Sequence, residues 1–388
     1  MLRTSFGSGL LVLVLWLAGL GAAAQFAKFA VPFGTVRLLY PEAGTEIGWL
    51  LTLISALGAV FGMTAGVLIA RIGLARAVIT ALVLGGVVSF WQATLPGFAI
   101  MLVSRVIEGV SHLMIVVAAP TLIAQITSGR FRGIGMTLWS TFFGVSFAVM
   151  VWIGLPFVGN RGLDGLLVAH GVYMLSVALF LGFLLSNVRR PETAAAVQRD
   201  QTPMIQKHID AYRSPDVAAP AIGWLFYTMT FVALLAVLPE LLPLSSRTLI
   251  VGFMPVVSIA VSLIIVSALL AKATAVAITI VGFLVSGSVV MLFFAGLPLP
   301  HLSIGLFAAL GLVQGASFAA VPELNATAES CALANGAMAQ MGNLGNLIGT
   351  PILLSILGYA GHAAMFLTVV LLYLFAVIAH VVMARARA

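Results

Sequence analysis

Long apolar runs, separated by short polar segments, fill most of the chain. A helix needs about 20 mostly apolar residues to cross a bilayer, and glycine and proline are tolerated inside such helices better than in soluble ones. The pattern predicts twelve membrane-spanning helices, over 9–35, 47–70, 77–95, 97–125, 134–158, 165–186, 218–240, 248–271, 274–297, 302–323, 335–357 and 361–383. We therefore expect an all-α polytopic membrane protein.

The first predicted helix has a second interpretation. Arg3, the apolar run 10–17 and the small residues 22–24 are also typical of a cleavable signal peptide. Because the apolar sequence continues past Ala24 as far as Phe33, we predict one long helix that stays in the protein.

The composition supports a membrane location. Hydrophobic residues make up 62% of the chain and charged residues only 7%, whereas soluble domains average about 45–50% and about 25%. Such a surface must face the lipid bilayer. The net charge of +7 does not indicate nucleic-acid binding, because the basic residues lie in short segments between apolar runs and form no patch. The single cysteine, Cys331, excludes a disulfide framework within the chain.

The lysines and arginines predict the orientation, because segments facing the cytoplasm carry an excess of them. With the N-terminus inside, the cytoplasmic segments carry Arg3, Arg71, Arg76, Arg130, Arg132, Arg189, Arg190, Arg199, Lys207, Arg213, Lys272, Arg385 and Arg387. The outer loops carry only Arg37, Arg161 and Arg247. We expect a multi-pass protein of the inner (cytoplasmic) membrane with both termini in the cytoplasm.

The longest polar stretch divides the predicted helices six and six. It indicates an N-terminal bundle over 1–186, a cytoplasmic linker over 187–217 and a C-terminal bundle over 218–388. The halves are weakly alike: 118–122 reads AAPTL and 320–324 reads AVPEL. Internal repeats with a substrate site at their interface are typical of secondary transporters.

Two motifs carry a resemblance to a known family. Residues 66–76 read GVLIARIGLAR, which resembles the Gly-x-x-x-Asp-Arg-x-Gly-Arg-Arg signature of the major facilitator superfamily. Residues 105–109 read RVIEG, similar to the family's Arg-x-x-Gln-Gly. The resemblance covers essentially the whole chain. It implies two pseudo-symmetric six-helix bundles with a central cavity lined by the first, fourth, seventh and tenth helices.

The same resemblance implies a conformational gate after the second helix. Gly66, Arg71, Gly73 and Arg76 match the signature. Its acidic position is Ala70, so the cytoplasmic latch that the acid provides in the family must be weaker here or built otherwise.

Ionisable residues inside membrane spans are costly and indicate function. Arg105, Glu108 and His112 are three and four residues apart and share one face of the fourth helix. Lys28 of the first helix and Arg105 both fall about 9 Å outside their helix midpoints, so they share a depth. We predict that Lys28 and Arg105, with Gln25, bind the substrate and that Glu108 and His112 couple protons.

The charge of this set points to an anion. Two cations and one carboxylate leave an excess of +1, and a guanidinium group suits a carboxylate or an oxyanion. Structural roles remain open. Arg105 and Glu108 could form only an intrahelical pair, Lys28 could extend to the outer interface, and His112 could pack against a backbone carbonyl.

The C-terminal half offers no basic partner. Tyr227, Gln314 and Asn343 are predicted to hold the uncharged part of the substrate, although Asn343 follows Gly342 and is also typical of close helix packing. This gives an asymmetric site, with charge on one half and hydrogen bonds on the other.

These features predict a monomeric secondary transporter that moves a small organic anion with protons by alternating access. The chain has no Gly-x-x-x-x-Gly-Lys-Ser/Thr motif, so we expect no cofactor and energy from a gradient. One alternative is proton-driven efflux of amphiphilic compounds, although 144–152 contains no proline of the drug-antiporter motif. A copper importer would use some of the 15 methionines, but their spacing is unconvincing. A non-transporting sensor would be expected to carry a soluble output domain. A channel or an enzyme would need a filter or a catalytic set, and the chain shows neither.

Overall fold

The computed structural model describes residues 5–127, 135, 138–139, 141–186, 204–326 and 328–387. These parts are helical and contain no strand. The first group of helices comprises α1 (Ser5–Ala30), α2 (Phe33–Leu39), α3 (Gly48–Thr52), α4 (Ala56–Ile72), α5 (Leu74–Ala93), α6 (Phe98–Ile126), α8 (Phe142–Val149) and α9 (Leu155–Ser186). The second comprises α10 (Met204–Arg213), α11 (Pro215–Leu241), α12 (Leu244–Ala260), α13 (Ser267–Leu269), α14 (Ala275–Met291), α15 (Leu299–Leu324) and α16 (Ala328–Arg387).

Short non-α segments join some of these helices. A 3₁₀ segment at Pro41–Ile47 leads into α3, and another at Leu53–Ser55 joins α3 to α4. Met150–Gly154 and Val261–Val266 are π-helical. Such segments are common at functional sites and local bends in long helices.

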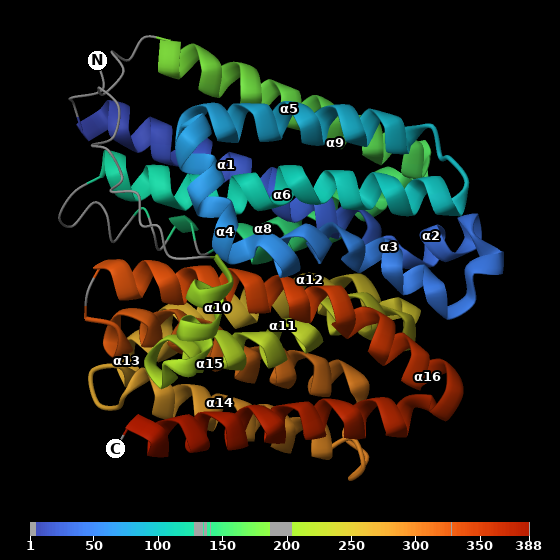
Figure 1. Ribbon diagram of the computed structural model, residues 1–388. Helices are drawn as coiled ribbons and strands as arrows, with labels where there is room; N and C mark the ends of the chain where they lie inside the picture. The colour runs from blue at the N-terminus through green and yellow to red at the C-terminus, as the bar shows by residue number, and fades with distance from the viewer. Residues whose placement is uncertain are drawn as a thin grey trace.

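The two groups of helices lie one above the other in Figure 1, with their long axes roughly parallel. The N-terminal and C-terminal ends lie at one end of the molecule, and α2 and α3 lie at the opposite end. One buried apolar core runs from Phe26 of α1 to Phe231 of α11 and so joins both groups. The bundle boundaries at 186 and 218 therefore remain a prediction.

Nine stretches of the described residues are long and apolar enough to cross a membrane. Two of them are far longer than one crossing needs, 142–185 with 44 residues and 333–387 with 55. Each reverses at a glycine with positive φ, Gly162 (77°) and Gly361 (79°), where an L side chain would be strained. The apolar helix α14 is shorter, with 17 residues. The structure is consistent with twelve spans.

The prediction of one continuous helix over 9–35 is wrong. Helix α1 ends at Ala30, and α2 begins at Phe33. Pro32 lies in the break. Its ring has no N–H to donate and collides with the preceding helical turn, so α1 cannot continue through it. The break turns α2 into a separate short helix at the end of the molecule opposite the termini.

The linker also differs from the expectation of a purely polar connection. Residues 204–213 form α10, and α11 begins at Pro215, three residues before the predicted start. The Tyr212 hydroxyl donates a hydrogen bond of 2.9 Å to the Gln340 side-chain carbonyl. Helix α10, which belongs to the predicted linker, therefore packs against α16.

The predicted gate is described in part. Gly73 separates α4 from α5 with φ of 91°, and Arg76 is exposed. Gly66 and Arg71 lie in α4, but their side chains fall outside the described part of the chain, as does that of Cys331.

Candidate functional site

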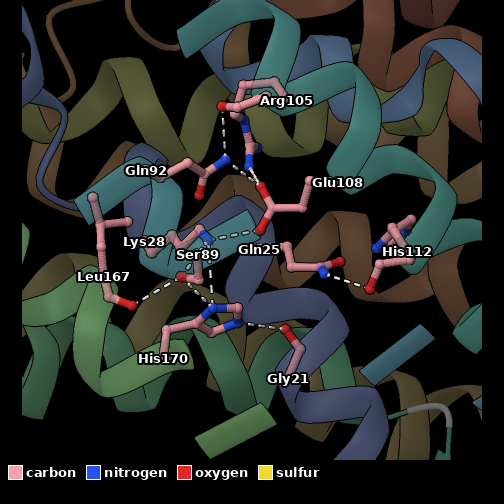
Figure 2. A network of polar contacts seen from close by, with 12 residues as sticks. Gly21, Gln25, Lys28, Ser89, Gln92, Arg105, Glu108, His112, Leu167 and His170 are labelled. Carbon is pink, nitrogen blue, oxygen red and sulfur yellow. Dashed lines mark hydrogen bonds and ion pairs between the residues drawn. The ribbon is translucent and has the colours of Figure 1, made fainter. Parts of the chain in front are cut away.

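A polar cluster lies inside the first group of helices, where α1, α5, α6 and α9 meet (Figure 2). Lys28, Arg105 and Glu108 form its centre, and the side chains of all three are fully buried. Apolar side chains make up most of the faces on which these helices pack together. Three charges removed from water inside a membrane span need partners, and the structure supplies them.

Glu108 receives three hydrogen bonds. The Lys28 ammonium donates to Glu108 Oε1 over 2.6 Å, and the Gln92 amide donates to Oε2 over 2.9 Å. Arg105 Nη1 donates to the same Oε2 from one turn earlier on α6. Both carboxylate oxygens are thus occupied by donors from three helices. The ion pair between Lys28 and Glu108 means that Lys28 does not extend to the membrane interface.

The Lys28 ammonium has partners for all three of its hydrogens inside the cluster. Besides Glu108, it contacts the Ser89 hydroxyl at 3.0 Å and His170 Nδ1 at 3.4 Å. Ser89 in turn donates to the Leu167 carbonyl over 2.9 Å. The lysine is therefore held by α5, α6 and α9 at once.

His170 connects the cluster to α1. Its Nε2 lies 3.1 Å from the Gly21 carbonyl, which can only accept, so Nε2 carries a hydrogen. Its Nδ1 lies 3.0 Å from the Ser89 hydroxyl and 3.4 Å from the Lys28 ammonium, from which it accepts when the ring is neutral. The sequence-based prediction overlooked His170, Ser89 and Gln92. The signal was there, because each is a polar residue inside a predicted span, but nothing in the sequence placed them beside Lys28.

Arg105 is only partly satisfied. Its Nε donates to the Leu50 carbonyl over 2.7 Å, and its guanidinium carbon lies 4.7 Å from the centre of the Phe29 ring. Its Nη2, although buried, has no hydrogen-bond partner among the described residues. The cluster therefore carries one excess positive charge and one unused charged donor.

Gln25 and His112 lie beside the cluster rather than in it. The Gln25 amide donates to the Ser111 hydroxyl over 2.9 Å, and His112 Nδ1 donates to the Ala22 carbonyl over 3.1 Å. In the described structure neither bonds to Glu108. A backbone carbonyl of α1 takes the ring hydrogen of His112, which is the packing contact left open by the sequence. The proton-coupling role of His112 stays a prediction.

Aromatic side chains connect this region to the second group of helices. Phe26 meets His112 edge-on at 5.0 Å between ring centres and lies 5.7 Å from Phe143 of α8. Phe143 lies 6.5 Å from Phe231 of α11. Tyr227 stacks on Phe231 at 5.0 Å. The rings form an unbroken apolar bridge between the two halves.

Two of the predicted site residues, Tyr227 of α11 and Gln314 of α15, contact each other. The Tyr227 hydroxyl donates to Gln314 Oε1 over 3.2 Å, and the Ser258 hydroxyl of α12 donates to the same oxygen over 3.1 Å. Asn343 behaves differently. Its amide donates to the Ala339 carbonyl of its own helix over 2.8 Å and packs directly against Gly58 of α4. Asn343 thus contributes to helix packing.

The cluster is closed to solvent at both ends of the molecule. At the end of α2 and α3, α3 packs against α16. Toward the termini, the Gln340 amide of α16 donates to the Ala59 carbonyl of α4 over 3.0 Å. The structure therefore represents a conformation in which neither end gives access to Lys28 or Arg105.

Among the described residues, no group of three or more His, Cys, Asp or Glu side chains could hold a metal ion. The polar chemistry of the described site is that of an ammonium, a guanidinium, a carboxylate and neutral hydrogen-bonding groups.

Residues 11–328 match the family model of the Major Facilitator Superfamily. The chain belongs to this superfamily. It is accordingly a multi-pass membrane protein and a secondary transporter, which confirms the resemblance found in its two motifs. No individual curated protein matches this major facilitator chain.

Proposed function

We propose that this transporter moves a small organic anion together with a proton, and that the anion binds to Arg105 and Lys28. The observation that carries the proposal is the unused Nη2 donor of Arg105 inside a cluster with one excess positive charge. A buried cation without a full set of partners favours an anion. The forked guanidinium suits a carboxylate, which accepts two parallel hydrogen bonds.

Anion binding would be coupled to a proton because Glu108 and the substrate carboxylate compete for the same donors, Lys28 and Arg105. Glu108 occupies both cations in the closed structure, so a substrate carboxylate would meet another carboxylate at bonding distance. A proton on Glu108 removes that repulsion and frees Lys28 and Arg105 for the substrate. Anion binding and Glu108 protonation therefore favour each other.

The charge of the cluster supports joint movement. Empty, it carries +1. With a protonated Glu108 and a bound monoanion it again carries +1, whereas a proton alone would raise it to +2. Because buried charge is costly in a membrane, the form with a proton alone is disfavoured. An anion alone would bring the charge to zero, but its carboxylate would then meet the ionised Glu108, so the empty and doubly loaded forms are the ones best suited to the change of access.

The second half would recognise the rest of the substrate. Tyr227 and Gln314 offer a hydroxyl and an amide, and the stacked rings of Tyr227 and Phe231 offer a flat apolar surface. Alternating access at the α4–α16 contacts would expose the site first at one end and then at the other. We propose that both termini lie in the cytoplasm, which the distribution of basic residues supports. We also propose that the protein acts as a monomer in the inner membrane.

The proposal is tested with purified protein in vesicles that contain a trapped pH dye. Small carboxylates and inorganic oxyanions are added with and without an imposed proton gradient. We expect saturable proton flux with one class of anion, lost in Arg105→Gln. The matched control is Arg161→Gln, because Arg161 is exposed and lies outside the cluster. Flux with lipophilic cations, unaffected by Arg105→Gln, would instead establish efflux of amphiphiles.

A further inference from the structure

A cavity of about 450 Å³ opens at the end of the molecule opposite the termini. Its wall is built from both halves of the chain: Arg37, at the end of α2, lies on one side, and Glu240 and Arg247, from α11 and α12, lie on the other. The distribution of basic residues predicts that this end faces outward. The contact between α3 and α16 lies at the same end of the molecule.

The arginines of this cavity are unexpected for an outer surface. Outer loops carry few basic residues, and only Arg37, Arg161 and Arg247 are predicted there. Two of these three line one cavity, although they are far apart in the sequence. Two cations placed near each other repel, and the single carboxylate of the cavity, Glu240, offsets only one of them, so their common position needs an explanation.

The two arginines of the cavity are not neutralised by an ion pair within the described part of the chain. Neither forms an ion pair with Glu240 or with another carboxylate of the described residues. Arg247 Nη2 donates to the Leu242 carbonyl over 3.2 Å, and its Nε is buried with no hydrogen-bond partner in the described structure. The cavity thus contains two guanidinium groups, one carboxylate and an excess charge of +1.

The position of Arg247 adds to this argument. It lies in the first turn of α12, where the helix dipole is positive and disfavours a cation. The residue before that helix, Pro243, gives no side-chain cap. An anion beside the Arg247 guanidinium would offset this unfavourable placement of a cation.

The cavity wall is held in place independently of a ligand. The Tyr40 hydroxyl, on the Arg37 side, donates to the Pro96 carbonyl over 2.8 Å. Gly34 of α2 packs against the Glu240 side chain, where a Cβ at that glycine would lie 3.2 Å from Oε1. The site is therefore formed before an anion arrives.

We propose that this cavity is an outer binding site for the transported class of anion, a small carboxylate or oxyanion held between Arg37 and Arg247. It concentrates the anion at the outer mouth before the α3–α16 contact opens toward Arg105. This inference rests on the proposed function, since it assigns the same ligand class to a second, earlier site on the same route.

Direct binding is tested by chemical protection of arginines. The protein in neutral-lipid vesicles is treated with phenylglyoxal, and modification is followed at each arginine by peptide mass spectrometry. Succinate, lactate and inorganic phosphate are the probes. We expect at least one of them to slow modification of Arg37 and Arg247 together while Arg161 reacts at an unchanged rate. Arg161 is the matched control, because it is an exposed arginine predicted at the same end and does not line the cavity.

Transport gives the second readout. Arg37→Gln and Arg247→Gln should each raise the external KM of the transported anion about fivefold, as expected for loss of one exposed charge pair, with little change in maximal rate. Glu240→Gln should lower KM, because it raises the cavity charge from +1 to +2. Arg161→Gln should leave KM unchanged.

The outcomes separate this inference from the proposed function. Anion transport with unchanged KM in both arginine variants and no protection would overturn the outer site and leave the central one intact. Protection of Arg37 and Arg247 without any anion transport would uphold anion binding in the cavity, but it would overturn the proposed function and with it the place of this cavity on a transport route. Protection only by vesicles that contain anionic lipid would show that a lipid headgroup is the ligand and would overturn the inference.

Discussion

Replacing Glu108 by glutamine should destabilise the protein more than replacing either of its basic partners. The carboxylate accepts hydrogen bonds from Lys28, Arg105 and Gln92, and all of these groups are buried. Glu108→Gln leaves two unpaired cations and a cluster charge of +2. Removing one member of a buried ionic network costs about 3–5 kcal/mol, because the remaining charges stay out of water without compensation.

Removing one of the two cations should destabilise the protein less than removing the charge of Glu108. Lys28→Met takes the cluster to zero net charge and leaves Glu108 paired with Arg105 and Gln92. The double variant Lys28→Met/Glu108→Gln returns to +1, with Arg105 still bonded to the Leu50 carbonyl. Lys28→Met should therefore recover part of the loss caused by Glu108→Gln, with a coupling of about 1–3 kcal/mol.

The assay is thermal unfolding of the purified variants in one detergent at one scan rate. We expect the unfolding midpoint to be highest in the wild type and to fall in the order Lys28→Met, double variant, Glu108→Gln. Glu42→Gln is the matched control, since it makes the same chemical change at an exposed carboxylate. The reasoning is refuted if Glu108→Gln is no less stable than Lys28→Met, or if the double variant is the least stable of all.

Three further predictions concern the contacts around the site. Gly62→Val should abolish transport without unfolding the protein, because a Cβ there would lie 2.8 Å from the Gln340 Cα and would hold α4 and α16 apart. Gly287 has open space around it, so the control Gly287→Val should transport normally. Equal transport activity of the two variants would contradict this reasoning. His170→Leu should lower the unfolding midpoint by an amount equivalent to about 1–3 kcal/mol, since it leaves one Lys28 hydrogen unpaired; an unchanged midpoint would show that Ser89 alone suffices. Tyr227→Phe should change KM for substrates that carry a hydroxyl or amide more than for plain carboxylates, because it removes the donor to Gln314 and keeps the ring; an equal change for both classes would place Tyr227 outside the binding surface.

The absence of the acidic residue from the signature after the second helix has a structural counterpart. Gln340 makes an uncharged connection across the α4–α16 contact by donating to the Ala59 carbonyl. Tyr212 of α10 supports the same glutamine through a 2.9 Å hydrogen bond. These neutral hydrogen bonds are a candidate for the cytoplasmic latch, which cannot use an acid because the signature position is Ala70. The polar sequence of the linker did not predict that its helix, α10, would contribute to this contact.

The apolar pattern alone determined that the chain is a helical membrane protein, because a helix is the one structure that satisfies the backbone within a lipid-spanning segment of this kind. The motifs at 66–76 and 105–109 pointed to the superfamily, and the family match confirmed it. The rarity of charge in the spans also pointed to Lys28, Arg105 and Glu108, since a buried charge is too costly to occur without a role.

Only the tertiary structure decided which of these residues meet. Sequence spacing fixes the face of a single helix, but it does not fix how four helices rotate and shift against one another. Packing therefore decided that His170 and Gln92 join the cluster, that a carbonyl of α1 takes the hydrogen of His112, and that Asn343 packs against Gly58. The same packing brings Arg37 and Arg247 to one cavity, which neither arginine's position in the sequence could show.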